Sequence, residues 1–172
     1  MSACKKTDIR TFRVPKESIP LVALEQRSNT PLTWTIPDHW EKQSLTTFRK
    51  ASYLVPHPSL PDVMGDFSIV SFPGDAGGLL NNVNRWRNQL SLPPISETER
   101  HDIQYTIQHD SLDIIFFDFI TSPSSTGDKK RLLIGTFLYH NERYFFKLTG
   151  PYDLLDTEKV AFMSILRTLS HD

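Results

Sequence analysis

Short segments in which apolar and polar residues alternate, each ended by proline or by turn residues, are the feature that most constrains this fold. Alternation with a period of two is typical of half-buried β-strands, because successive side chains of a strand point to opposite faces of the sheet. Proline donates no backbone hydrogen bond and therefore marks strand ends. On these grounds we predict strands at 32–36, 49–55, 66–72, 112–121, 131–139 and 143–149.

Other segments have the 3.6-residue periodicity of amphipathic helices. A helix is predicted over 79–90, and its apolar face consists of Leu79, Val83, Trp86 and Leu90. Ser96 begins a short second helix, because Glu99 three residues later completes a capping box. A last helix is predicted near the C-terminus, where Asp156 or Thr157 is a suitable N-cap. The apolar face of this last helix consists of Leu155, Phe162, Leu166 and Leu169.

The order of these elements lacks the regular strand–helix–strand alternation of a parallel, doubly wound sheet. Hairpin-spaced strands combined with amphipathic helices favour an α+β fold, in which helices cover a mainly antiparallel sheet. We assign residues 32–172 to this single globular domain. Residues 1–31 precede it as a tail and linker, in which the alternating segment 9–14 is a candidate short strand.

Charge and composition narrow the range of partners and cofactors. The chain has 19 basic and 20 acidic residues and a net charge of −1, whereas nucleic-acid binding needs clustered lysines and arginines. The one cysteine excludes a disulfide framework and a thiolate zinc site, and the six histidines show no HExxH pattern. No apolar run approaches the roughly 20 residues that cross a bilayer. We therefore expect no nucleic-acid partner, metal site, cofactor or catalytic residue.

Small residues before the lone cysteine, Cys4, resemble the end of a bacterial lipoprotein signal peptide. Such a cysteine carries acyl chains, and each buried methylene contributes ~0.8 kcal/mol to peripheral membrane anchoring. The charged and apolar regions of a complete signal peptide are missing from this sequence. Two interpretations stay open: Cys4 is the lipid-attachment site of a trimmed lipoprotein, or it is an ordinary thiol and Met1 is the native start.

Three segments stand out by their residue order: VPKE at 14–17, GG-x3-NVNRWR at 77–87 and FFKLTGP at 145–151. Together they resemble a family of uncharacterised bacterial secreted or lipoprotein-like proteins, over nearly all of residues 9–169. The resemblance implies organisation and not activity. The element order is also similar to the fold of PsbP from the oxygen-evolving complex and of Mog-type Ran-binding proteins, an analogy at the level of fold alone.

The polar side of the helix at 79–90 is rich in amides, although a merely solvated helix face usually carries glutamate and lysine. Amides pair with backbone groups, and arginine binds a carboxylate through two parallel hydrogen bonds. One interpretation is a recognition face; the other is that these side chains bind loops of the same domain, such as 56–65. The residues concerned are Asn81, Asn84, Arg85 and Asn88.

Asp118 and Lys147 are charged residues within otherwise apolar strands. Asp118 shares a strand face with Ile114 and Phe116, and a carboxyl group in such a place is a candidate catalytic group with a raised pKa. A structural interpretation is that the two residues form a buried polar pair, because a carboxylate rarely stays buried without a partner.

These observations favour a non-catalytic binding or accessory domain, held at the bacterial cell envelope through Cys4. Its partner is an unknown protein or small ligand. One alternative is an enzyme or ligand-processing domain with a site near Asp118 and Lys147. Another is a cytosolic protein-interaction domain, which follows if Met1 is the native start.

Overall fold

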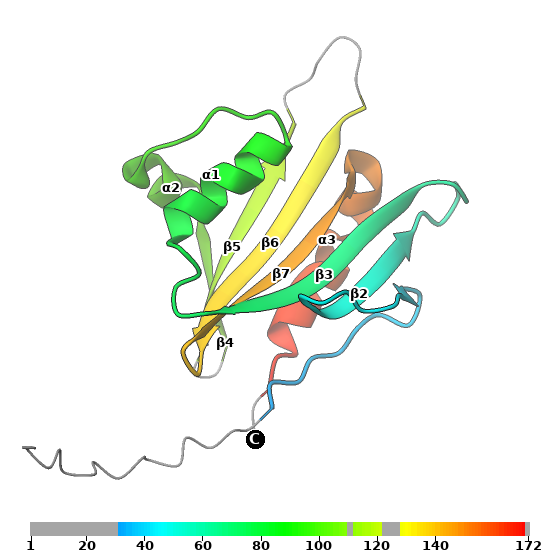
Figure 1. Ribbon diagram of the computed structural model, residues 1–172. Helices are drawn as coiled ribbons and strands as arrows, with labels where there is room; N and C mark the ends of the chain where they lie inside the picture. Colours follow the sequence, from blue (N-terminus) through cyan, green and yellow to red (C-terminus); the bar gives the residue numbers. More distant parts are fainter. Residues whose placement is uncertain (1–30, 110–111, 122–127, 171–172) are drawn as a thin grey trace, which may run out of the picture.

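The structure is a computed structural model that describes residues 31–109, 112–121 and 128–170. Within this part of the chain, an antiparallel sheet of seven strands has the order β1-β2-β3-β7-β6-β5-β4 (Figure 1). The predicted α+β fold with a mainly antiparallel sheet is confirmed. The strands are β1 (Glu41–Lys42), β2 (Arg49–Pro56), β3 (Met64–Pro73), β4 (Tyr105–His109), β5 (Leu112–Ile120), β6 (Lys130–Tyr139) and β7 (Glu142–Pro151).

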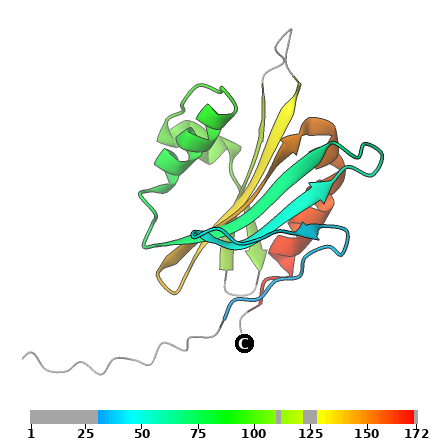
Figure 2. The same ribbon diagram turned by 45° about the vertical axis from the view of Figure 1, so that its right-hand side comes forward.

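Helices lie on both faces of the sheet. Figures 1 and 2 show α1 (Leu79–Gln89) and α2 (Glu97–Ile103) on one side and α3 (Tyr152–Arg167) on the other. We call these the α1 face and the α3 face. None of the described helices is long and apolar enough to cross a membrane.

The chain builds the sheet from both edges inward. After β3 it leaves the sheet through α1 and α2 and returns at the far edge as β4, and hairpins then lead through β5 and β6 to β7. β7 closes the sheet by pairing with β3, in a register that runs from Asp66 opposite Thr149 to Pro73 opposite Glu142. The two central strands are therefore far apart in the sequence.

Each face of the sheet has its own apolar core. On the α3 face, Phe67 and Phe146 are fully buried with Phe162 of α3. On the α1 face, Trp86 of α1 is 4% exposed, and its ring packs edge-on against Phe145 with 5.4 Å between centroids. The predicted core positions of Trp86 and of the last helix's apolar face are therefore confirmed.

The predicted strand at 32–36 is wrong. Thr33 makes a single antiparallel bridge to Ser170, and no strand runs beside the rest of the segment within the described residues. Its alternation has another cause, because Leu32, Trp34 and Ile36 pack against the core of the α3 face. Residues 41–42 instead form the short edge strand β1, which the sequence pattern did not predict.

The last helix begins at Tyr152, earlier than the predicted caps at Asp156 and Thr157. Pro151 holds an extended backbone directly before it, and the Tyr152 N–H donates to the Lys129 carbonyl at 2.8 Å. A neighbouring backbone thus satisfies a donor that a side-chain cap usually satisfies. The capping box of Ser96 and Glu99 is confirmed. The candidate strand at 9–14 and Cys4 lie outside the described residues.

Gly135 of β6 allows α3 to approach the sheet closely. A Cβ at this position would lie 2.6 and 2.7 Å from the two methyl carbons of Leu166, which is fully buried. We expect Gly135→Ala to lower the free energy of unfolding by about 1–3 kcal/mol through overpacking, measured by urea denaturation. The same substitution in a Leu166→Ala background should cost clearly less. Equal costs in the two backgrounds would contradict this contact.

Candidate functional site

In two neighbouring rows of the sheet, the α1 face changes from apolar to polar between β6 and β7, whereas in the row of Phe145 and Val70 it stays apolar. In one row of cross-strand neighbours, Phe117 of β5 and Ile134 of β6 are followed by Lys147 of β7, Ser68 of β3 and Ser52 of β2. The next row repeats this change. It consists of Phe119, Leu132, Thr149, Asp66 and Leu54.

The change coincides with the edge of the helical cover. Val83 and Trp86 of α1 pack against the apolar side chains of β5 and β6 and against Phe145 of β7. In Figures 1 and 2, α1 and α2 stand over that side of the sheet, and no described helix lies over the same face of β2 and β3. We call the polar side chains outside the cover of α1 and α2 the open half; Ser52 and Ser68 among them are buried, and the others are partly exposed. Its residues are Arg49, Ser52, Asp66, Ser68, Lys147 and Thr149.

An ion pair with two parallel hydrogen bonds orders the outer part of the open half. The two terminal nitrogens of Arg49 each donate to one carboxylate oxygen of Asp66, both at 2.8 Å, and one also donates to Ser52 Oγ at 2.8 Å. The hydrogen bond to Asp66 raises the pKa of Arg49, against the opposing effect of burial. Because the pair is partly exposed, its contribution to stability is small. Its main effect is to fix the guanidinium over β2 and β3.

Lys147 lies between this ion pair and α1. Its Nζ donates to Gln89 Oε1 of α1 at 2.6 Å. Burial lowers the pKa of Lys147, the positive charges of Arg49 and Arg85 lower it further, and the negative charge of Asp66 opposes them. The charges of Arg49, Asp66 and Arg85 therefore all act on Lys147.

The predicted recognition face does not act as one surface. Asn84 binds both backbone groups of Ile95: its amide donates to the carbonyl at 3.0 Å and its oxygen accepts from the N–H at 2.8 Å. Asn81 donates to the Gly77 carbonyl at 2.9 Å. These two amides serve loops of the same domain, as the second interpretation of the helix predicts, although the loops are not the segment 56–65.

Arg85 and Asn88 are the exposed members of this group that bind no loop through a described hydrogen bond. Arg85 donates to Asn82 Oδ1 at 2.6 Å, and its positive charge helps to lower the pKa of Lys147. Asn82 was not predicted: it is buried and donates to the carbonyls of Ala76 and Gly78. Of the four predicted residues, Arg85 is thus the one that belongs to the edge of the open half.

Asp118 and Lys147 do not form a pair. Asp118 lies on the α3 face and accepts hydrogen bonds from Arg131 at 2.7 and 2.6 Å and from Lys159 at 2.8 Å. Lys147 lies on the α1 face, because its neighbours Phe146 and Leu148 point into the core of the α3 face. The sheet separates the two residues, so they do not form one site.

Asp118 belongs to a buried ion network at the margin of α3. Burial alone would raise its pKa, but the hydrogen bonds and charges of Arg131 and Lys159 outweigh burial and lower it. Arg131 is 5% exposed, and its remaining terminal nitrogen donates to Asp156 at 2.7 Å. The raised pKa expected of a catalytic carboxyl group is therefore not found, and Asp118 stays ionised as a structural anion.

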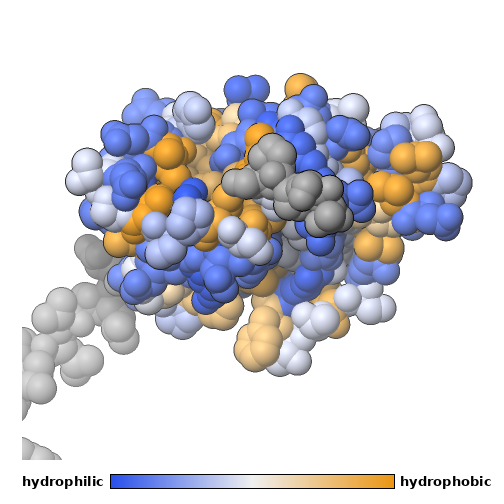
Figure 3. Space-filling model, turned by 90° about the horizontal axis from the view of Figure 1, so that it is seen from above, coloured by the Kyte–Doolittle hydropathy of each residue, from blue (hydrophilic) through white to orange (hydrophobic). Residues whose placement is uncertain are grey.

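A hollow of about 370 Å³ continues the open half toward the end of the sheet where β6 begins. Charged side chains of both signs line it, including Asp66, Asp128 and Lys130. Figure 3 views the molecule from this end, where hydrophobic side chains form separate areas among hydrophilic ones. Apolar side chains, including Leu54, Met64 and Pro151, line the hollow beside these charged ones, so it combines apolar and charged walls.

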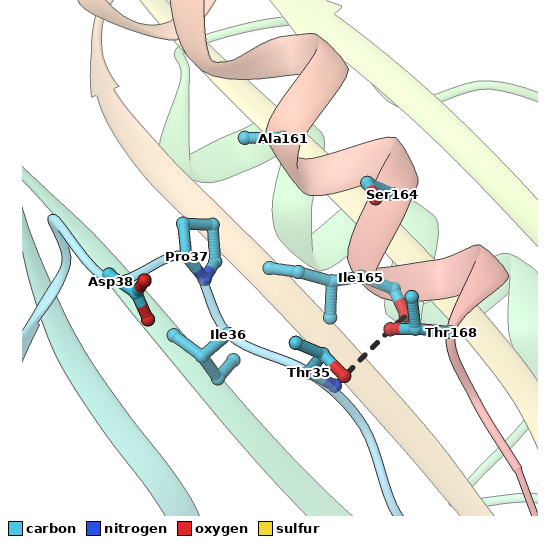
Figure 4. A pocket seen from close by; sticks show the side chains of 8 residues that line it. All are labelled: Thr35, Ile36, Pro37, Asp38, Ala161, Ser164, Ile165 and Thr168. Atoms are coloured by element: carbon cyan, nitrogen blue, oxygen red, sulfur yellow. Dashed lines mark hydrogen bonds between the residues drawn. The ribbon is translucent and has the colours of Figure 1, made fainter.

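A second hollow, of about 350 Å³, lies between residues 35–38 and α3 (Figure 4). At its base the Thr35 N–H donates to Thr168 Oγ1 at 3.2 Å. Nearby, the Trp40 indole N–H donates to the buried carboxylate of Glu158 at 2.9 Å, and His39 Nε2 lies 3.0 Å from the same carboxylate. These contacts hold the segment to α3, so this hollow is a by-product of packing and a weaker candidate site.

Comparison with known proteins identifies the fold. No protein-family model and no curated protein sequence matches the chain. LpqN of Mycobacterium tuberculosis, a protein involved in cell envelope biogenesis, has a similar structure, with a TM-score of 0.57 and 11% identity over 85% of this chain and 87% of LpqN. CyanoP of Synechocystis sp. PCC 6803, a cyanobacterial PsbP, has a TM-score of 0.51 and 10% identity over 89% and 99% of the two chains. The fold is PsbP-like.

The resemblance to the PsbP fold drawn from the element order is therefore confirmed, and the similarity to Mog-type proteins stays a prediction. Membership of the bacterial family suggested by the segments at 14–17, 77–87 and 145–151 stays a prediction. Among the residues that the structure describes, no three histidine, cysteine, aspartate or glutamate side chains are grouped so that they could hold a metal ion.

Removal of the Asp118 charge tests the ion network. We expect Asp118→Asn to lower the free energy of unfolding by about 3 kcal/mol, because the buried Arg131 loses its less exposed counter-ion and keeps only the exposed Asp156. The matched control is Asp156→Asn, whose parent side chain is 58% exposed and contacts the same arginine; it should cost less than about 1 kcal/mol. Urea denaturation of both variants at pH 7 makes the comparison, and equal losses would contradict the network.

Asp118→Asn should also change how the free energy of unfolding depends on pH. Because the folded-state pKa of Asp118 is lowered, its ionised form stabilises the native state above the unfolded pKa, and this stabilisation is lost as the pH falls below about 4. The stability of Asp118→Asn should therefore fall less steeply than that of the wild type in this acidic range.

Proposed function

We propose that the protein is a non-catalytic binding domain of the bacterial cell envelope and that the open half is its binding surface. The observation that carries the proposal is the change of the α1 face from apolar to charged where the cover of α1 ends. In two rows, Lys147 with Ser68 and Thr149 with Asp66, this face is polar across β7 and β3. Ligand sites are concave and mostly apolar, with a few converging polar groups, and the hollow lined by Asp66 and Thr149 adjoins these rows.

The cell-envelope part of the proposal has separate support. LpqN, which shares the fold, is described as involved in cell envelope biogenesis, and the residues before Cys4 resemble the end of a lipoprotein signal peptide. The cytosolic alternative predicts a different cellular fraction. The enzymatic alternative depended on a shared site of Asp118 and Lys147, and the opposite faces of these residues remove its geometric basis.

Chemical-shift mapping tests the binding surface. Isotope-labelled protein is titrated with the soluble small molecules and peptides extracted from bacterial envelopes. We expect amide shift changes at residues 66–68 and 147–149, and few on α3. Arg85→Glu should weaken them by reversing a charge at the edge of the open half, while Arg167→Glu, at the exposed end of α3, should leave them unchanged. Shifts confined to α3, or conversion of the bound compound into a product, would contradict the proposal.

Cellular fractionation tests the anchor. When the complete reading frame is expressed in a bacterial host, we expect the protein in the membrane fraction and the Cys4→Ser variant in a soluble fraction, because acyl chains hold the protein on the bilayer. Incorporation of labelled palmitate into the wild type alone provides the second measurement. An unlabelled protein with the same distribution as Cys4→Ser would instead support the cytosolic alternative.

A further inference from the structure

The strand β4 forms an open edge of the sheet. It stands last in the strand order and pairs with β5 alone among the described residues (Figure 1). An edge strand presents unpaired backbone N–H and C=O groups, which proteins usually protect with charged residues, proline or a very short strand. The opposite edge has this protection, because β1 consists of Glu41 and Lys42 alone. β4 has five residues, Tyr105–His109, and contains no lysine, acidic residue or proline.

The edge of β4 also exposes apolar surface on the α3 face. Ile107 packs against the core of this face, and the ring centroid of Tyr105 lies 6.3 Å from that of Phe116 in the same core. The Tyr105 side chain is nevertheless 62% exposed. A further strand beside β4 would therefore pair the free backbone groups and also bury part of this tyrosine.

The chain before Leu32 enters the domain close to this edge. Thr33 and Ser170 exchange two backbone hydrogen bonds, of 2.9 and 3.0 Å. The carbonyl of the preceding residue, Leu169, accepts a hydrogen bond from His109 Nε2 at 2.6 Å, and His109 is the last residue of β4. The N-terminal segment thus joins the domain beside one end of the open edge.

We propose that residues 9–14, which lie outside the described residues, dock on the edge of β4 as a further strand of the sheet. The segment has the alternation of a strand and ends at Pro15. Residues 15–31, which link it to the domain, span up to roughly 55 Å when extended, whereas β4 is about 17 Å long. The segment therefore reaches either end of the edge.

The side chains of the segment suit the two faces of this edge. In an extended segment Phe12 and Val14 point to one side and Arg13 to the other. When Phe12 and Val14 face α3, they lie beside the exposed ring of Tyr105, and Arg13 lies on the α1 face. Asp113 of β5 is exposed on that face, one strand in from the edge. Apolar contact and opposite charges therefore favour the same orientation.

The linker favours this segment over a strand from a second copy of the chain. A short tether holds a docking segment at an effective concentration of about millimolar, so the contact within one chain forms at much lower protein concentrations than a contact between two chains. The edge of β4 lies across the sheet from the open half on β2, β3 and β7. The docking therefore does not depend on the binding function proposed for the open half.

Docking would also decide where the proposed lipid anchor holds the domain. With residues 9–14 bound, only residues 5–8 separate Cys4 from the edge of β4. β4 runs beside the first half of β5, whereas the start of β6 pairs with the last residues of β5. A lipid on Cys4 would thus hold the domain by the β4 edge, away from the end of the sheet where β6 begins.

Amide hydrogen exchange of the full chain, followed by NMR, tests the docking. Successive N–H groups of a strand point to opposite neighbours, so β5 protects only alternate amides of residues 105–109. We expect both sets of amides to exchange slowly in the wild type, independently of protein concentration. Fast exchange of the outward set would overturn the proposal. Protection that rises with concentration would overturn it as well, because a second copy would then cover the edge.

Proline variants of the full chain identify the segment. Thr11→Pro and Phe12→Pro each remove one N–H group, and the two groups point to opposite sides, so one variant loses a hydrogen bond to β4. We expect that variant to speed the exchange of the outward β4 amides at least about tenfold. Ser28→Pro, in the linker, is the matched control and should leave the exchange unchanged. Exchange equal to the wild type in both segment variants would contradict the docking.

A synthetic peptide of residues 8–15 completes the test. At about millimolar concentration, which matches that of the tethered segment, it should restore slow exchange in the proline variant that opens the edge. A peptide of the same composition in scrambled order should not. Thermal unfolding shows that each variant is folded. Restoration by both peptides, or by neither, would overturn the assignment to residues 9–14.

Discussion

The pairing of β3 with β7 joins the two halves of the sheet, and its register decides what each face presents. In this register Phe67 and Phe146 point into the core under α3, while Ser68 and Lys147 point to the α1 face. A slip of one residue in either strand would exchange its faces and place charged side chains in an apolar core. The burial of the phenylalanines therefore also fixes where the charges of the open half stand.

On the α1 face, the helices cover only part of the sheet. α1 covers β5, β6 and the part of β7 around Phe145, through residues such as Val83 and Trp86. The polar side of the same helix is divided between two roles: Asn84 holds a loop and Arg85 stands at the edge of the open half. One short helix thus stabilises half of the face and contributes charge to the other half.

The sequence predicted most of the elements, although not β1, and it did not predict the contacts of the charged side chains. Periodicity predicted the helix that carries Trp86, and spacing alone predicted the capping box at Ser96. Of the six predicted strands, five are strands in the structure, and the sixth, at 32–36, is a packed segment with a single bridge. The pair of Asp118 and Lys147 was wrong because periodicity shows which residues share a face of one strand, but not which face of the sheet that is. Arg49 and Asp66 were missed for the same reason, although the alternation of Asp66 and Ser68 with apolar residues was a usable signal.

The bridge between Thr33 and Ser170 brings the beginning and the end of the described chain to one corner of the molecule. In Figure 1 this corner lies at the bottom, whereas β6 begins at the top, where the hollow beside Asp66 and Lys130 is found. The chain before Leu32 would therefore tether the domain at the end of the sheet opposite that hollow. Tether and hollow would be separated by the length of the strands, so attachment at one end would leave the other accessible.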